Sequence, residues 1–312
     1  MGKSVCIAVL NFNGIQFLEE LIPSLRAALA AWGGECSVVI LDNQSTAPVG
    51  EWAAENCPEF EFIRAPENKY FFSYNDLIAS RTEDVFILLN NDIRVDPDFI
   101  APLMKHFAAA DVFAVGATSK DWEGRNYTTG PWYLYTRKGL YFWGARRDQQ
   151  RASHTLLTVG GHMAVCRRKF LELGGFNSLF YPAYCEETAI CLQAWRRGWR
   201  SIFEPSSLVY HYDGGSFDKN SSKARIQLRS YFMLQMACLP PVEPRWLSSL
   251  WIGLRMVCYT AAFKTYYPAT YLNTWIEWRR LRKHYASLKM KQHELDEIVR
   301  RISEPLSLTS PT

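Results

Sequence analysis

The feature that most constrains the fold of this sequence is an alternation of short apolar segments with longer amphipathic segments over residues 5–117. The apolar segments have the length of buried strands, and the amphipathic segments repeat apolar residues at helical spacing. This order predicts an α/β fold with a mostly parallel sheet and helices on both faces. The predicted strands are Val5–Leu10, Val38–Leu41, Phe60–Arg64, Val85–Leu89 and Val112–Ala117, and the predicted helices are Ile15–Ala31, Val49–Asn56, Tyr74–Ser80 and Asp98–Ala109, the last with Asp96 as its cap.

The pattern changes after residue 118. Residues 120–155 are rich in Trp and Tyr with Gly, Thr and Arg between them, which predicts an irregular aromatic loop or a hairpin. From Lys223 onward the pattern is helical and is interrupted by prolines. Between these regions we expect strands at Leu156–Cys166, Ser201–Glu204 and Leu208–His211, and helices at Arg168–Leu173 and Glu187–Arg197.

Charge is unevenly distributed along the chain. Residues 222–302 carry 14 Lys and Arg against five Asp and Glu, although the net charge of the whole chain is only +4. A basic C-terminal region predicts an anionic partner, and membrane phospholipid, nucleic acid and an acidic protein are all alternatives. No known nucleic-acid module is visible, so we do not expect a nucleic-acid partner.

The cysteines and the N-terminus bear on the cellular compartment. The eight cysteines form no CxxC pair, so a zinc site is not expected and reduced thiols of a cytoplasmic protein are the simpler interpretation. The first apolar run is too short for a signal peptide and is interpreted as a buried strand.

Acidic and polar residues cluster at three places. Asp42 and Asn43 follow one apolar strand, Asn90-Asn91-Asp92 follow another, and Glu186-Glu187 precede a helix. One such cluster alone is more often a structural cap, but ligands in α/β sheets bind at the carboxyl ends of the strands, and three clusters at that edge favour a site. The glycine-rich phosphate loops of Rossmann and P-loop proteins are missing from the sequence, so a bound nucleotide diphosphate would need a carboxylate-held divalent cation.

Seven short motifs occur in order over about two-thirds of the chain. The motifs are Val9–Gly14, Leu41–Thr46, Glu67-Asn68, Leu88–Asp92, Gly174–Phe176, Tyr184–Glu187 and Tyr210–Ser216. With them the sequence resembles the inverting glycosyltransferases of family 2, which have the GT-A fold, and in particular the rhamnosyltransferase-like branch.

The resemblance implies a donor site. Asp42 matches the acidic residue that contacts the nucleotide base, and Asn11, Asn68 and Asn91 belong to motifs expected beside the donor. Asp92 matches the last residue of the DxD metal motif and would hold Mg²⁺ or Mn²⁺.

The metal motif departs from the family pattern, because Asn90 and Asn91 stand where a second carboxylate is usual. His211 matches a position that ligates the metal in some relatives; the alternative is a strand-end histidine bonded to backbone. Arg64 and Lys69 are candidates to assist the diphosphate by position only, and solvated surface charges are the simpler interpretation.

The resemblance also implies a general base. Glu186-Glu187 match a Glu-Asp pair in which one carboxylate deprotonates the acceptor hydroxyl. Glu187 stands where the family usually has Asp, so either residue of the pair is a candidate for the base. The alternative is a glutamate pair placed at a helix start by the helix dipole alone.

The remaining predictions concern the acceptor and the C-terminal helices. Trp122, Trp132 and Trp143 are expected to form an acceptor wall, since sugar rings stack on aromatic faces; a loop core or a dimer contact is the alternative. The basic C-terminal helices, residues 221–312, would meet a membrane surface, pack on the catalytic domain or form a homo-oligomer interface.

The whole sequence therefore predicts a GT-A catalytic domain at residues 1–220 with a donor-binding part (1–118) and an acceptor-binding part (119–220). The expected reaction is metal-dependent, inverting transfer from a UDP- or dTDP-sugar, with dTDP-rhamnose as one candidate, to a saccharide or lipid-linked acceptor. The resemblance implies bacterial surface polysaccharide (lipopolysaccharide) synthesis in the cytoplasm or on the cytosolic face of the inner membrane. The alternatives are a nucleotidyltransferase-like enzyme and a non-catalytic nucleotide-sugar-binding protein.

Overall fold

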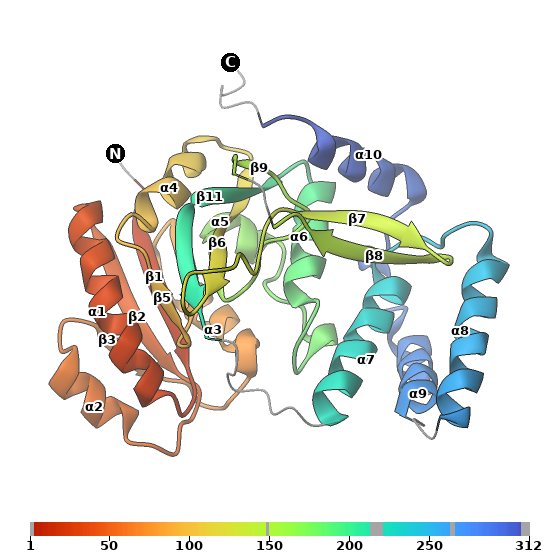
Figure 1. Ribbon diagram of the computed structural model, residues 1–312, viewed down its shortest axis with the longest axis horizontal. Coiled ribbons are helices and arrows are strands. Elements are labelled where there is room, and N and C mark those ends of the chain that lie inside the picture. Colours follow the sequence, from red (N-terminus) through yellow and green to blue (C-terminus); the bar gives the residue numbers. More distant parts are fainter. Residues whose placement is uncertain (1–2, 148–149, 213–220, 263–265, 307–312) are drawn as a thin grey trace.

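The protein is built around a curled central sheet with helices on both sides (Figure 1). A computed structural model describes residues 3–147, 150–212, 221–262 and 266–306. The sheet has nine strands in the order β3-β2-β1-β4-β10-β6-β11-β5, and β9 pairs with β11 beside this path. Residues 213–216 of the predicted motif Tyr210–Ser216 lie outside the described residues, and so does the predicted domain boundary at residue 220.

The first half of the sheet has the predicted parallel arrangement. β1 (Val5–Asn11) lies between β2 (Cys36–Asp42) and β4 (Val85–Asn90), β3 (Glu61–Arg64) pairs with β2, and all three pairings are parallel. Side chains alternate across this sheet, so one set of β1 residues packs on the α1 side and the other packs on the opposite side. The connecting helices α1 (Ile15–Trp32), α2 (Val49–Asn56) and α3 (Ser73–Ser80) confirm the predictions within two residues.

Beyond β4 the sheet becomes mixed. β10 (His162–Cys166) lies antiparallel between β4 and β6 (Val112–Asp121), and β11 (Arg200–His211) runs parallel to β6. Two short strands complete it: β9 (Ser153–His154) and β5 (Ile93–Val95), both antiparallel to β11. The predicted strand Leu156–Cys166 is thus regular only in its second half, and the three-residue β5 is too short to show a periodicity.

Two predicted boundaries are wrong for local reasons. The two short strands expected near the end of the sheet are one strand, β11, whose pairing shifts register between Glu204 and Leu208. The helix predicted from Asp98 starts later, as α4 (Ile100–Met104), and continues as a 3₁₀ helix, η2 (Lys105–Ala108). Asp96 does not cap α4; its Oδ1 accepts a hydrogen bond from the amide of Asp98 at 3.1 Å in the preceding turn.

The aromatic region contains the predicted hairpin. β7 (Trp132–Arg137) and β8 (Leu140–Ala145) pair antiparallel as a separate two-stranded sheet. Lys138 and Gly139 join them, both with positive φ, which is the backbone twist that two-residue hairpin turns require.

The helices that follow divide between two cores. The main core includes side chains of α6 (Glu186–Arg196), α7 (Ser221–Ala237) and α10 (Gln292–Ser303), and Trp278 and Leu281 at the end of α9 (Tyr266–Leu281) pack against it. A smaller cluster joins α8 (Arg245–Ala261) and the rest of α9 to Phe232 of α7. α7 and α10 are therefore packed on the part of the chain that forms the central sheet, which is the kind of packing that one of the predicted alternatives describes. None of the described helices combines the length and the apolar character that crossing a bilayer requires. The remaining helical segments are α5 (Arg167–Glu172), η1 (Tyr70–Phe72), η2 (Lys105–Ala108), η3 (Ser178–Phe180) and η4 (Ala286–Leu288).

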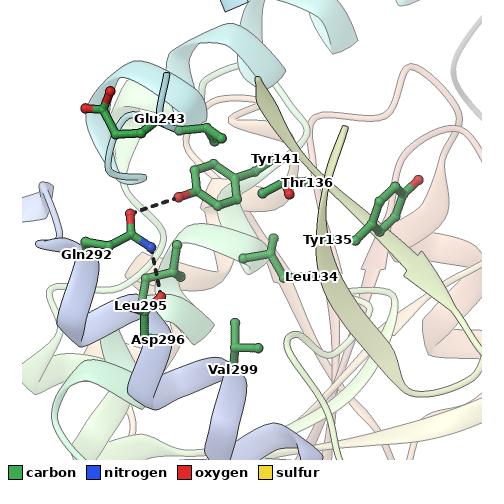
Figure 2. Close-up of a pocket in the computed structure, with 10 residues that line it drawn as sticks. Leu134, Tyr135, Thr136, Tyr141, Glu243, Gln292, Leu295, Asp296 and Val299 are labelled. Atoms are coloured by element: carbon green, nitrogen blue, oxygen red, sulfur yellow. Dashed lines mark hydrogen bonds between the residues drawn. The ribbon is translucent and has the colours of Figure 1, made fainter. Parts of the chain in front are cut away.

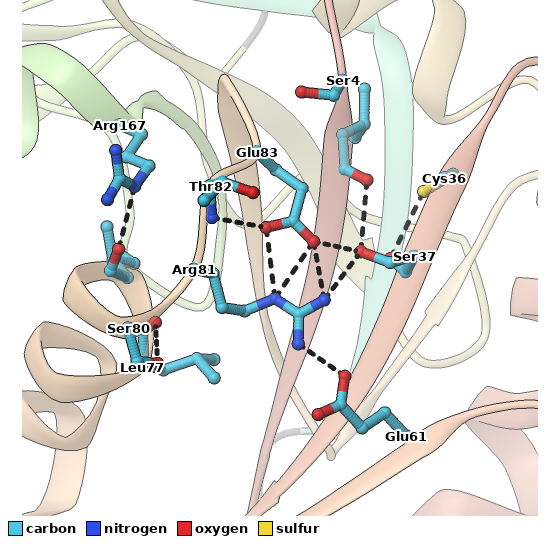
Figure 3. A network of polar contacts seen from close by, with 12 residues as sticks. Ser4, Cys36, Ser37, Glu61, Leu77, Ser80, Arg81, Thr82, Glu83 and Arg167 are labelled. Carbon is cyan, nitrogen blue, oxygen red and sulfur yellow. Dashed lines mark hydrogen bonds and ion pairs between the residues drawn. The ribbon is translucent and has the colours of Figure 1, made fainter.

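A charged network holds the amino end of the sheet (Figure 3). Arg81 Nη2 lies 2.6 Å from Glu83 Oε1, its Nη1 lies 2.5 Å from Glu61 Oε2, and Ser37 Oγ donates to Glu83 at 2.7 Å. Burial raises the pKa of Glu83, but hydrogen bonds from Arg81 and Ser37 outweigh it and lower that pKa to about 2. This network lies at the start of β2, so it is structural and separate from the carboxyl edge.

Candidate active site

Three of the predicted donor residues form one buried hydrogen-bonded chain. The parallel register places Asn11, at the end of β1, opposite Asp42, at the end of β2. Asn91 Nδ2 donates to Asn11 Oδ1 at 2.7 Å, and Asn11 Nδ2 donates to Asp42 Oδ1 at 3.2 Å. All three side chains are buried. The carboxyl edges of β4, β1 and β2 are therefore linked through side chains rather than only through the sheet.

Asp42 is held by further contacts on its own loop. Ser45 donates to it twice, from its amide at 3.1 Å and from its hydroxyl. The half-exposed Arg64 lies 3.6 Å from Asp42 Oδ2 and also donates to the carbonyl of Ser45 at 3.1 Å. Two carboxylate oxygens have about four acceptor positions, so these contacts nearly fill them. A ligand that used Asp42 would displace one of them, and Arg64 is the most exposed.

Asp92 and His211, the two predicted metal ligands, lie together. The strand β5 begins directly after Asp92 and pairs with the end of β11, which puts His211 opposite Ile93. His211 Nε2 lies 3.6 Å from Asp92 Oδ1, and the amide of Tyr212 donates to the Asp92 carbonyl at 2.9 Å. Within the described ranges, no three His, Cys, Asp or Glu side chains are grouped so that they could hold a metal ion. The described part of the chain would thus offer two ligands at this place, Asp92 and His211.

Asn68 and Lys69 lie in the loop that leaves β3. Asn68 Oδ1 accepts from the amide of Tyr70 at 2.9 Å and so shapes the loop. Lys69 pairs with Glu67 at 3.3 Å and Asp76 at 3.0 Å. Lys69 is thus paired with surface carboxylates, in agreement with its simpler interpretation, whereas Arg64 contacts Asp42 and Ser45.

Glu186 and Glu187 open helix α6 from an unusual backbone. The two preceding residues, Tyr184 and Cys185, have φ of 72° and 69°, the left-handed region that non-glycine residues rarely adopt. Such conformations cost about 1–3 kcal/mol each and persist where the surrounding structure enforces them. They aim the first turn of α6 inward, so that Glu186 is buried and Glu187 is half-buried.

The two glutamates share a desolvated environment. Burial raises the pKa of Glu186 well above its ordinary value, and the neighbouring charge of Glu187 raises it further. Burial also raises the pKa of Glu187, while hydrogen bonds from its own amide and that of Gly160 oppose this. Oε2 of each carboxyl has no hydrogen-bond partner among the residues that the structure describes. Buried carboxyl oxygens are normally paired, so this pair is unusual for a structural role alone.

The segment Gly160-Gly161 brings the glutamate pair to the edge of β4. Gly160 contacts Glu187, and the carbonyl of Gly161 accepts from the amide of Asn90 at 2.9 Å. A Cβ on Gly161 would lie 2.7 Å from Asn90 Nδ2, closer than any ordinary contact. The glycine pair thus keeps Glu187 and the end of β4 in close approach, and its signal in the sequence is the Gly-Gly before an apolar strand.

His162 is a site residue that the sequence analysis missed. It begins β10 and is 3% exposed, and its Nδ1 has no hydrogen-bond partner within the described part of the chain. Burial, assisted by the nearby charge of His211, lowers the pKa of His162 to about 3, so the ring is neutral. His162 lies at the carboxyl end of β4 because β10 pairs antiparallel with β4, which sets His162 opposite Leu89.

The three predicted acceptor tryptophans separate in the structure. Trp122 lies beside the Asp92–His211 pair: its ring is 4.2 Å from the Arg94 guanidinium and edge-on to Tyr212 at 5.9 Å. Trp132 and Trp143 lie in the hairpin and pack against the main core. The exposed aromatic rings of β7 are instead Tyr133 and Tyr135, and the acceptor role of all three tryptophans stays a prediction.

A separate groove of about 560 Å³ lies between the hairpin and α10 (Figure 2). Tyr141 from β8 donates to Gln292 Oε1 at 3.3 Å across it, and Gln292 donates to Asp296 at 2.8 Å. None of the predicted site residues lines this groove. The candidate active site is therefore the carboxyl edge of the sheet and not this cavity.

Comparisons with known proteins agree with this fold. A family model described as glycosyl transferase family 2 matches residues 4–174, which is more than half of the chain. No curated protein matches the chain.

Two similar solved structures share the GT-A fold. The crystal structure of GalNAc-T7 with UDP, GalNAc and Mn²⁺ is 15% identical, with a TM-score of 0.60 over 91% of this chain and 58% of that one. The mannosyltransferase PcManGT from Pyrobaculum calidifontis, in complex with GDP-Man and Mn²⁺, is 14% identical, with a TM-score of 0.55 over 96% of this chain and 84% of that one. At such identities the likeness shows the fold alone.

Proposed function

Because the chain belongs to glycosyl transferase family 2, we propose that it transfers a sugar, with inversion, from a nucleotide diphosphate donor to a saccharide or lipid-linked acceptor. The observation that carries this proposal is the convergence of Asp42, Asp92 and the Glu186-Glu187 pair at one edge of the sheet. Similar structures were solved with UDP or GDP-Man and Mn²⁺, which supports this class of donor. The setting we propose is bacterial surface polysaccharide synthesis at the cytosolic face of the inner membrane.

The donor base would be bound by Asp42. A carboxylate accepts the imide N–H of uracil or thymine, so a UDP- or dTDP-sugar, including dTDP-rhamnose, fits this residue. Asp42 already has several partners, and we expect the base to replace the exposed Arg64, which lies 3.6 Å away. Once released, the guanidinium would be free to bind a phosphate.

Asp92 and His211 would hold a divalent cation, Mg²⁺ or Mn²⁺. One carboxylate and one imidazole fit an ion whose other positions are taken by diphosphate oxygens and water. When bound, the ion neutralises charge that develops on the departing diphosphate. We therefore expect weak metal binding without donor and tighter binding with it.

Glu187 is the residue we assign as general base. Of the two coupled glutamates, Glu187 is supported by the backbone of Gly160, whereas the pKa of Glu186 is raised further by its neighbour. The pair would share one proton, with Glu186 keeping it and Glu187 ionised. Glu187 would take the acceptor hydroxyl proton as that oxygen attacks the anomeric carbon and the diphosphate leaves from the opposite face.

Donor turnover tests this proposal. UDP- and dTDP-sugar hydrolysis or transfer would be measured for the wild type, Asp92→Ala, Glu187→Gln and the surface control Glu55→Gln. We expect losses of about 10²-fold or more for the first two variants and none for the control, the usual range for general-base and metal-ligand changes. Equal activity in all four proteins would refute the mechanism and favour a non-catalytic binding protein.

A nucleotidyltransferase is the other enzyme class with a similar α/β domain. It would need a glycine-rich loop with Arg or Lys after the first strand, and Asn11–Gly14 contains neither Arg nor Lys. Incubation with UTP or dTTP, a sugar 1-phosphate and a divalent metal would separate the classes, because only a nucleotidyltransferase releases pyrophosphate from these substrates.

A further inference from the structure

Helix α8 has a row of exposed apolar side chains on the side that faces away from the protein. Ile252, Met256 and Tyr259 point into the small core that α8 shares with α9. The residues at positions 246, 250, 254 and 257 recur every three or four residues on the opposite face. They are Trp246 (63% exposed), Leu250 (52%), Leu254 (50%) and Val257 (68%).

Helix α9 adds a second apolar patch that ends in a basic run. Leu272, Trp275 and Ile276 are all at least 41% exposed. The Arg279 guanidinium lies 4.9 Å from the Trp275 ring. Four exposed cations follow, and none of them forms an ion pair within the ranges that the structure describes: Arg279, Arg280, Arg282 and Lys283.

This region contains very little negative charge. Glu243 is the only acidic residue of the sequence from position 221 to position 276. It pairs with Arg245 at 2.8 Å, and the next acid, Glu277, accepts from Arg229 at 3.0 Å. Both acids of this region are thus paired with an arginine, whereas the four cations at the end of α9 form no ion pair with the described residues.

We propose that the outer faces of α8 and α9 dock on the surface of an anionic lipid bilayer. We call this surface the docking face and define it by Trp246, Leu250, Leu254, Leu272 and Ile276. A bilayer interface accepts apolar side chains and places phosphates beside arginines, which meets both properties of the face. A second copy of the chain would instead bring like charges together, which is unfavourable.

The position of the helices is compatible with docking. In Figure 1, α8 lies at the opposite end of the molecule from α1 and α2, so a planar surface can reach it. α7 and α10 are excluded from the face because they belong to the main core. Docking would deliver the proposed transfer site to a lipid-linked acceptor, but the docking itself does not require transfer activity.

Vesicle flotation tests the proposal directly. The full chain would be mixed with vesicles of phosphatidylcholine alone or of phosphatidylcholine with phosphatidylglycerol. We expect binding to the anionic vesicles, and a loss of about tenfold or more for the triple variant Trp246→Ser/Leu250→Ser/Leu254→Ser, since each removes an apolar group from the interface. Val299→Ser, which changes an exposed apolar residue of α10, is the matched control and should bind normally. Arg279→Ala/Arg280→Ala should weaken binding to anionic vesicles by about tenfold.

Cys258 provides a second measurement that needs no apolar substitution. It is the one exposed cysteine of the eight and lies on α8, so a polarity-sensitive fluorophore can be attached there selectively. Its emission should shift to the blue with anionic vesicles and stay unchanged with phosphatidylcholine alone.

Two results would overturn the proposal. One is absence of both flotation and spectral shift with anionic vesicles. The other is a wild-type dimer in light scattering that the triple variant converts to a monomer, with no vesicle binding, which would assign the face to a second copy. Donor hydrolysis by the same preparations separates either result from failure of the proposed reaction.

Discussion

Replacing Gly14 with alanine should damage the donor site without straining the backbone. Gly14 precedes helix α1 with φ of −124°, so it does not occupy the left-handed region that favours glycine. A Cβ there would lie 2.0 Å from Asn91 Nδ2 and 3.0 Å from Asn11 Oδ1. The substitution therefore acts on the hydrogen bond between these two asparagines.

The size of the effect follows from that contact. An ordinary carbon–nitrogen contact is about 3.4 Å, so the Asn91 amide must move by about 1.4 Å. Its 2.7 Å hydrogen bond to Asn11 cannot survive such a shift, because hydrogen bonds are lost beyond about 3.5 Å. A buried polar group left without its partner costs about 1–3 kcal/mol. If donor binding needs the intact chain Asn91–Asn11–Asp42, affinity should fall about tenfold to a hundredfold.

Calorimetric titration of Gly14→Ala with UDP- and dTDP-sugars, together with chemical denaturation, measures both effects. Gly253→Ala is the control, because a Cβ at Gly253 meets nothing within 4 Å. Its place inside α8 should stabilise the protein by about 1 kcal/mol and leave donor affinity unchanged. Wild-type donor affinity in Gly14→Ala would refute the role of the asparagine chain in the site.

Three further predictions concern stability. Glu83→Gln should lower the free energy of unfolding by about 3 kcal/mol at pH 7, because folding lowers the pKa of Glu83 from 4.5 to about 2 and each unit is worth about 1.4 kcal/mol. This stabilisation of the wild type should disappear as pH falls from 4.5 towards 2. A wild-type free energy of unfolding that stays constant over that pH range would contradict the prediction. Cys185→Gly should be more stable than Cys185→Ala by about 1 kcal/mol, since both remove the sulfur but only glycine relieves the left-handed φ of 69°; the reverse order in urea denaturation would rule out strain. Glu186→Gln should raise the melting temperature at pH 7, because a carboxyl whose pKa is raised on folding loses stability as pH rises through and above its ordinary value; a lower melting temperature at pH 7 than the wild type would mean that the Glu186 charge stabilises the fold.

The strand-end part of the site could be predicted from the sequence because it depends on local pattern and on one general rule. Apolar runs define β1, β2 and β4, and parallel strands present their carboxyl ends at one edge. The polar residues at the ends of those runs, Asn11, Asp42 and Asn91, were therefore expected close together, and their hydrogen bonds show that they are.

The second half of the site depends on contacts between distant segments. β10 inserts antiparallel beside β4, which brings His162 and the Gly160-Gly161 turn to the donor edge. No local periodicity specifies which neighbour an apolar strand selects, because that choice depends on the packing of both sheet faces at once. The left-handed conformation of Cys185 could not be predicted from the sequence either, since contacts from outside the segment enforce it.

The C-terminal helices show the same division. Their helical character, their basic net charge and the single acidic residue between positions 221 and 276 are properties of the sequence alone. Which of them are buried was decided only by tertiary packing: α7 and α10 complete the main core, while α8 and α9 keep apolar faces exposed. Periodicity shows that a helix has an apolar face, but only the folded chain determines whether enough partner surface remains to cover it.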